Sequence, residues 1–215
     1  MAYNHQAAVI GCAISAPIAS ADKALEELLY DVTRRALADA GVGIEDIDGI
    51  VVASNDQFDG RAISVMMASG SVGGVDRDIL STPSAGEHAF VMCVLRVASG
   101  QYRTQLVVSW SPTEASSLSE AQRLAADPYF HRRLPLDELS SHALQATALA
   151  SRVPNVHELA ASVVAKNRRN GARAYPEAVT SPDAPAAGSS RTIRWPLTQD
   201  MTAPPVTGVV ALVLA

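Results

Sequence analysis

The chain has 215 residues, 48% of them apolar and 18% charged, which is the composition of a globular protein with room for one substantial core. Its formal net charge of -5, with no cluster of Lys and Arg, disfavours nucleic acid as a partner. No apolar run reaches the ~18 residues that span a bilayer, and the N-terminus lacks the basic stretch of a secretory signal. We therefore expect a cytoplasmic protein with no membrane partner.

In chain order, the first 53 residues alternate apolar and amphipathic segments. The runs 7–13 and 47–53 predict two buried strands. Between them, apolar residues recur at helical spacing, and Gly41 follows the last turn as a C-cap. Strand, helix and strand predict a βαβ unit, which is almost always right-handed.

The next elements lead to a turn of unusual composition. Residues 61–70 predict a second helix, and 78–82 predict a brief third strand. This strand runs directly into the segment 83–90, Pro-Ser-Ala-Gly-Glu-His-Ala-Phe. A helix with little polar surface is expected from about 84 to 99, and 104–110 predict the fourth strand.

The composition changes between residues 111 and 195, where Pro, Ser, Ala and charged residues dominate. Two helices are expected inside this region, at about 136–150 and at 156–170. The apolar run 206–215 predicts a fifth strand.

Two cysteines, Cys12 and Cys93, fall in the first strand and in the apolar helix. We expect both to be buried, reduced packing residues. Neither has a CxxC partner or a nearby pair of histidines, so no metal site is expected.

The segment 83–90 resembles the nucleophilic elbow of the thiolases, Cys-x-Ser-Gly-x-x-Ala, in which a strand turns into a buried helix. Gly86 and Ala89 match this pattern, and Ala85 stands at the position of its Ser. Pro83 stands at the position of the nucleophilic Cys. Proline has no nucleophilic side chain, so no thioester can form there.

The resemblance extends over most of the chain. The stretch from Glu158 through 166–170 to Tyr175 resembles the thiolase branch linked to sterol-carrier and lipid-transfer proteins. The resemblance implies one domain over residues 1–215, equivalent to the N-terminal half of an acetyl-CoA acetyltransferase-like thiolase. Its α/β fold would be a five-stranded mixed sheet with helices on both faces, and 111–195 would form a helical excursion between strands four and five.

The resemblance also bears on activity. The second half of a thiolase, which carries the catalytic His and the acid/base Cys, has no counterpart in these 215 residues. We therefore expect a non-catalytic subunit, a pseudoenzyme that scaffolds or shapes a complex handling acyl-CoA in C–C bond formation or cleavage. One alternative is an acyltransferase or C–C lyase for acyl thioesters with a non-standard or partner-completed site. Another is a simple acyl- or CoA-binding module.

The enzymatic alternative rests on Ser84, Glu87 and His88, which lie near a helix N-terminus where the dipole favours negative charge. In that hypothesis Glu87 beside His88 supplies a base for Ser84. However, adjacent helical residues point about 100° apart, and Pro83 followed by Ser84 is an ordinary way to begin and cap a helix. We favour the capping interpretation, and likewise favour packing over a role for Cys93 as a displaced nucleophile.

Coenzyme A or acyl-CoA is the ligand that the resemblance implies, with no cofactor bound covalently. In thiolases, helices of the excursion contact this cofactor. Two Arg pairs are therefore candidates to bind its phosphates: Arg132, Arg133, Arg168 and Arg169. The alternative is that these arginines are solvated surface residues.

Partners are expected because the apolar segment 89–95 is unsuited to face water. In thiolases, the third strand pairs across a dimer axis, and here it is 78–82. We expect a homodimer through this edge or a heteromer with a thiolase-like subunit. Members of the branch also associate with small OB-fold, zinc-ribbon proteins, which are a further possible partner.

Overall fold

The computed structural model describes residues 6–18, 22–59, 63–83, 85–111, 117–176 and 190–215. The chain divides into unit 1, residues 1–116 and 206–215, and unit 2, residues 117–205. Unit 2 contains most of the excursion expected at 111–195. The interpretation of the whole chain as one domain stays a prediction. Within the described ranges, no helix has both the length and the apolar character needed to cross a membrane.

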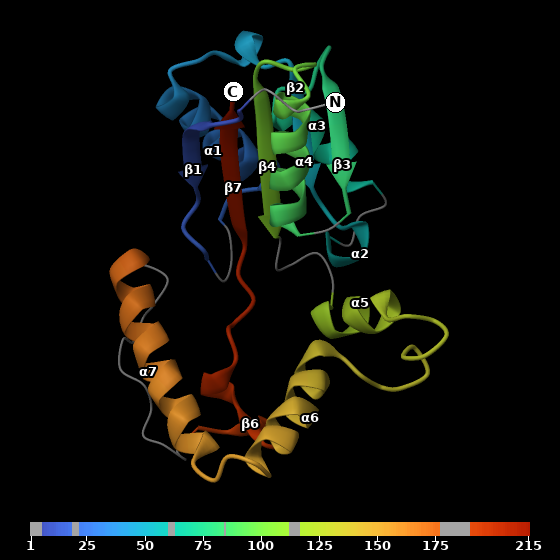
Figure 1. The fold of residues 1–215 in the computed structure, drawn as a ribbon, viewed down its shortest axis with the longest axis vertical. Helices are drawn as coiled ribbons and strands as arrows, with labels where there is room; N and C mark the ends of the chain where they lie inside the picture. Colours follow the sequence, from blue (N-terminus) through green and yellow to red (C-terminus); the bar gives the residue numbers. More distant parts are fainter. Residues whose placement is uncertain (1–5, 19–21, 60–62, 84, 112–116, 177–189) are drawn as a thin grey trace. The chain divides into compact units, whose positions relative to one another are not determined.

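Unit 1 is built on one five-stranded sheet in the order β1-β7-β4-β2-β3 (Figure 1). Its strands are β1 (Val9–Ile14), β2 (Gly49–Ala53), β3 (Asp78–Thr82), β4 (Gln105–Ser111) and β7 (Gly208–Leu214). β2 runs parallel to β3 and β4, whereas β7 is antiparallel to β1 and β4. The mixed sheet is confirmed, with β3 at one edge as expected. The strands of the predicted βαβ unit, β1 and β2, are separated by β7 and β4.

One face of the sheet is covered by α1 (Leu25–Ala40), which packs on β1 and β7, with α3 (Ser64–Ser71) beside it. Leu29, Val32 and Ala36 form the buried stripe of α1. Gly41 ends the helix in the left-handed conformation at φ 69, as its C-cap role requires. Short elements η1 (Ile44–Asp46) and α2 (Asp56–Asp59) flank β2.

The opposite face carries α4 (Gly86–Ala98), which packs mainly on β4 and β2. Ala89, Cys93 and Val97, one turn apart, are its buried residues, and they join a cluster with Val51 and Val107 of the sheet. Helices on both faces are thus confirmed. Successive side chains of β2 point to opposite faces of the sheet. Val51 therefore lies in the core under α4, whereas Ile50 and Val52 lie in the core on the α1 side.

The expectation that both cysteines are buried is wrong for Cys12, which is exposed, and right for Cys93. Cys12 pairs with Leu212, on the side of the sheet that carries α4, but α4 itself lies over β2 and β4. The neighbouring apolar side chains Ile14 and Val210 are exposed as well. Burial of Cys12 requires a covering element on β1 and β7, and α4 does not extend that far.

Unit 2 contains both helices expected in the excursion, α6 (Glu138–Ala150) and α7 (Val156–Ala174). It also contains elements that the sequence did not indicate: α5 (Leu118–Ala125), the hairpin of β5 (Thr192–Arg194) and β6 (Leu197–Thr198), and η2 (Gln199–Met201).

Candidate active-site elbow and the surfaces around it

The strand-to-helix turn predicted from sequence lies where β3 ends and α4 begins, at the carboxyl end of the parallel strands. Two contacts fix the end of β3 to β2. The Thr82 hydroxyl donates to the Val52 carbonyl at 3.2 Å, and the Ser54 amide donates to the Thr82 carbonyl at 3.2 Å. The turn therefore starts from a well-anchored strand end, which is where open α/β sheets place their ligand sites.

Gly86 allows α4 to approach β4 closely at this turn. A Cβ atom at Gly86 would lie 2.9 Å from Ser109 Oγ and 3.1 Å from Ser109 Cβ, closer than such atoms normally come. The elbow thus needs glycine because there is no space for a Cβ atom. The backbone conformation does not require it, since φ at Gly86 is not positive. The Gly of the predicted elbow motif has a structural explanation in the packing of α4 on β4.

Pro83 is exposed at the start of the turn, and Ser84 lies outside the described residues. The N-cap of α4 is Ala85, whose side chain makes no capping hydrogen bond. The backbone amide of His88 donates to the Ala85 carbonyl at 3.0 Å and closes the first turn.

Glu87 and His88 are both exposed in this first turn. As neighbours on a helix, they project in directions about 100° apart and do not converge on one point. Among the described residues of the elbow, 83 and 85–88, these two are the only titratable side chains. The first turn of α4 thus carries two exposed polar side chains close to a proline.

Cys93 lies two turns further along α4, inside the core. Burial raises the pKa of its thiol to about 12, although the charge of Arg96 acts slightly in the opposite direction. A thiol with this pKa is almost entirely protonated at neutral pH, so it is a poor nucleophile.

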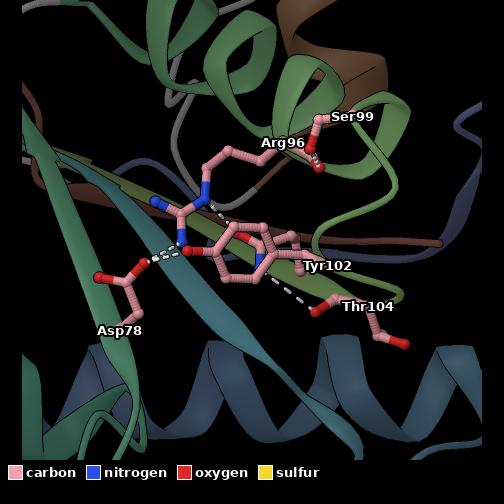
Figure 2. A network of polar contacts seen from close by, with 6 residues as sticks. Asp78, Arg96, Ser99, Tyr102 and Thr104 are labelled. Atoms are coloured by element: carbon pink, nitrogen blue, oxygen red, sulfur yellow. Dashed lines mark hydrogen bonds and ion pairs between the residues drawn. The ribbon is translucent and has the colours of Figure 1, made fainter. Parts of the chain in front are cut away.

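A polar network, which the sequence did not indicate, holds the other end of α4 (Figure 2). Arg96 donates through Nη2 to Asp78 Oδ2 at 2.6 Å and through Nε to Gln105 Oε1 at 2.9 Å. Its guanidinium carbon lies 4.0 Å from the ring centroid of Tyr102, whose hydroxyl also donates to Asp78. A Cβ at Gly49 would come within 2.9 Å of Arg96 and 2.7 Å of Gln105.

The network shifts the titration of two of its members. Hydrogen bonds from Tyr102 and then from Arg96 hold the pKa of Asp78 below its usual value. The hydrogen bond between Tyr102 and Asp78 also raises the pKa of Tyr102. Arg96 thereby ties the C-terminal end of α4 to β3 and β4, and we assign this network a structural role in positioning α4 and its N-terminal elbow.

No protein-family model and no curated protein matches the sequence. Solved structures resemble it, however. An Ltp2-ChsH2(DUF35) aldolase aligns with a TM-score of 0.69 and 19% identity over 98% of this chain and 55% of its own. A monomeric SCP2-thiolase like protein type 1 (STLP1) from Mycobacterium smegmatis gives a TM-score of 0.69 and 16% identity over 97% of this chain and 45% of its own.

An acetyl-CoA acetyltransferase from Syntrophomonas wolfei gives a TM-score of 0.61 and 17% identity over 97% of this chain and 64% of its own. The fold is thiolase-like. The chain spans about half of the length of the first two of these structures, which are 55% and 45% covered.

The thiolase-like fold places the four candidate arginines in unit 2, where they do not gather at one point. Arg132, in the loop after α5, donates to the carbonyls of Leu124 in the last turn of α5 and of Ala126, and Arg133 beside it is exposed. Arg168 and Arg169 lie on α7, at the other side of unit 2 from that loop (Figure 1).

Arg168 has a neighbour of opposite charge. Burial acts to raise the pKa of Asp200, but hydrogen bonds involving Thr198 and Ser190 and the charge of Arg168 lower it overall. Binding of CoA phosphates by these arginines stays a prediction.

The outer face of α4 is strongly apolar, as the sequence indicated. Val91, Met92 and Leu95 are 53%, 37% and 48% exposed. We call these three residues the α4 face, together with the exposed Ile14 and Val210 on the same side of the sheet. Large exposed apolar patches on proteins are often sites of association.

Proposed function

We propose that this chain is a non-catalytic, thiolase-like subunit that scaffolds an acyl-CoA-handling complex. In this proposal, a partner carries the chemistry of C–C bond formation or cleavage. The observation that carries the proposal is Pro83 at the β3–α4 turn, where the thiolase-like elbow motif calls for a nucleophilic Cys. A proline offers neither an attacking atom nor a backbone N–H at that corner.

The remaining groups near the turn support the same conclusion. Glu87 and His88 are exposed, and as neighbours on a helix they project in different directions. Cys93, with a pKa of about 12, sits in the core behind the turn.

The partner in this proposal is a thiolase-like subunit that covers the α4 face. An apolar helix face beside uncovered apolar strands fits another apolar helix and sheet surface, because burial of such area is the main driving force of stable association. The resemblance to the sterol-carrier and lipid-transfer branch supports this partner. So does the aldolase among the similar structures, whose description joins Ltp2 with a DUF35 protein, ChsH2. A small OB-fold, zinc-ribbon protein would be a third component.

Coenzyme A or acyl-CoA is the ligand of the complex in this proposal, held without a covalent bond to this chain. The first experiment is to incubate the purified chain with acetyl-CoA and to measure its intact mass. We expect an unchanged mass. An acetyl adduct on any side chain of residues 83–88 contradicts the proposal and supports the enzymatic alternative.

The second experiment tests scaffolding with a defined partner. A thiolase-like subunit from the same source is co-expressed with this chain, and CoA release from acyl-CoA is measured with and without this chain. We expect the activity to require this chain and to persist in the double variant Glu87→Ala/His88→Ala. A loss of about 100-fold or more in that variant, with an intact complex, would instead place the two residues in the reaction.

A further inference from the structure

Unit 2 contains an open cavity of about 650 Å³, which no step of the proposed function uses. It lies between α5, α6, the β5–β6 hairpin and η2, so every wall belongs to one unit. Its size is in the range of small-molecule sites, roughly 300–1,000 Å³. Leu139, Ile193, Leu197 and Met201 provide apolar walls.

The walls are tied together from behind by one carboxylate, that of Asp137 at the N-cap of α6. It accepts from the Ser140 amide at 2.8 Å and from the Ser119 hydroxyl of α5 at 2.8 Å, and it lies 3.6 Å from Arg194 of β5. Hydrogen bonds from Ser140, and to a lesser degree from Ser119, lower the pKa of Asp137 to about 2, against the effect of burial. At neutral pH this carboxylate is ionised and holds three walls in place.

The cavity is not closed by packing, because the buried side chains among the described residues of unit 2 are small. They are Ala121, Ala143 and Pro196. The larger apolar side chains remain only partly buried around the cavity instead of filling it. An apolar ligand entering this space would therefore bury surface that the unit itself leaves in contact with water.

Polar groups converge at one end. Gln122 Nε2 donates to Glu138 Oε2 at 2.6 Å, so one oxygen of this carboxylate is engaged. The other, Oε1, lies 3.6 Å from His142 Nε2, just beyond hydrogen-bond distance. The side chains of Glu138 and His142 are 63% and 61% exposed, which places the pair at the mouth.

A hydroxyl group beside these two atoms can contact both, since it can donate to the Glu138 carboxylate and accept from the imidazole N–H of His142. A carboxylate head group fits poorly, because it has no proton to donate and would face the negative charge of Glu138. We propose that the unit 2 cavity binds an aliphatic molecule bearing a hydroxyl group, with its chain between α5, α6 and the β5–β6 hairpin and its hydroxyl at Glu138 and His142. This proposal is independent of the β3–α4 elbow.

The test uses the full chain with ¹³C-labelled Ile, Leu and Met methyl groups, observed by NMR. The probes are octan-1-ol and octanoate, which share a similar chain and differ in the head group. We expect octan-1-ol to shift the methyl signals of Ile193, Leu197 and Met201 in a saturable way. Octanoate should bind roughly tenfold more weakly or worse, because it loses a hydrogen bond to a charged group and meets its repulsion.

Three variants locate the site. Leu139→Trp fills the cavity and should weaken octan-1-ol binding at least about tenfold, since it removes the apolar contacts of the chain. Leu144→Trp is the matched control, because Leu144 is exposed on the same helix and does not line the cavity. Glu138→Gln removes the charge that rejects octanoate and should abolish most of the preference between the two probes.

Each remaining outcome overturns the proposal. Shifts that do not saturate indicate unspecific partitioning, and equal binding of the two probes contradicts the role of Glu138 and His142. Equal weakening by Leu139→Trp and Leu144→Trp contradicts the location. If Leu139→Trp does not fold, the Glu138→Gln comparison decides alone, because an unchanged preference there contradicts the assignment of the polar end.

Discussion

At the residue scale, the elbow depends on Gly86, because this residue has no side chain. In Gly86→Ala, the new Cβ would lie 2.9 Å from Ser109 Oγ, so α4 or β4 must shift. We expect this variant to lose about 1–3 kcal/mol of unfolding free energy, as overpacked cores do. Urea denaturation followed by circular dichroism measures the change.

Gly70→Ala is the matched control for that prediction. Gly70 also lies in a helix, α3, but nothing stands within 4 Å of a Cβ built there. Alanine should therefore stabilise the protein by about 0.4–1 kcal/mol through its higher helix propensity and its less flexible unfolded chain. Equal effects of the two substitutions would contradict the close approach of α4 to β4.

The two cysteines give a second prediction at this scale. At pH 8 in the native state, we expect Cys12 to react readily with a thiol reagent because it is exposed. Cys93 should react only on unfolding, since burial raises its pKa to about 12. Absorbance of the released chromophore counts the thiols. Two thiols reacting at one fast rate in the native protein would mean that the α4 core opens easily, and would revive Cys93 as a candidate nucleophile.

At the scale of elements, the Asp78–Arg96–Tyr102 network fixes α4 against the edge strand β3, and this makes stability depend on pH. The folded-state pKa of Asp78 lies below its unfolded value, about 3.9, because Tyr102 and Arg96 stabilise the carboxylate. Its contribution is therefore present above that value and is lost as the pH falls through the folded pKa. Asp78→Asn should reduce stability at pH 7, and its deficit should shrink at pH 3.

The comparison with Asp22→Asn separates this effect from general acid destabilisation. Asp22 is exposed near the start of α1, outside the network. Unfolding free energies from urea titrations at pH 7, 5 and 3 should show a pH-dependent deficit for Asp78→Asn and a small, nearly constant one for Asp22→Asn. A deficit for Asp78→Asn that does not change with pH would mean that Asp78 acts by packing alone.

Local sequence patterns predicted most of the elements of unit 1. They did so where the spacing of buried apolar residues within one helix or strand defines that element. The bounds of β3, Asp78–Thr82, agree with the prediction because an apolar pair is bracketed by polar residues. The start of α4 was predicted only approximately, at about residue 84 against Gly86 in the structure, because the small residues before Glu87 carry no periodicity. The β5–β6 hairpin was missed because strands of three and two residues are too short for an alternating pattern.

Features that depend on contacts between distant elements did not follow from local patterns. Asp78 is separated by 18 residues from Arg96 and by 24 from Tyr102, with no motif joining them. The exposure of Cys12 depends on how far α4 extends over the sheet, which no window around Cys12 contains. The cavity of unit 2 likewise arises from Asp137 drawing α5, α6 and β5 together.

At the scale of the whole molecule, the α4 face is the surface on which the proposed assembly depends. Leu95 of this face is 48% exposed, so Leu95→Glu places a charge in the proposed interface with little effect on the free subunit, because Glu is a good helix former. We expect the variant to weaken assembly at least about tenfold, as a buried unpaired charge does. Light scattering and sedimentation at micromolar concentration, with and without the thiolase-like subunit, measure the effect.

Met66→Glu is the control, because Met66 is 69% exposed on α3, on the opposite side of the sheet from α4. It should leave assembly unchanged. Assembly should also slow the reaction of Cys12 with thiol reagents, since Cys12 lies on the same side of the sheet as α4. A chain that stays a monodisperse monomer with or without the subunit, and whose Cys12 reacts at one constant rate, would show that the α4 face has no partner there.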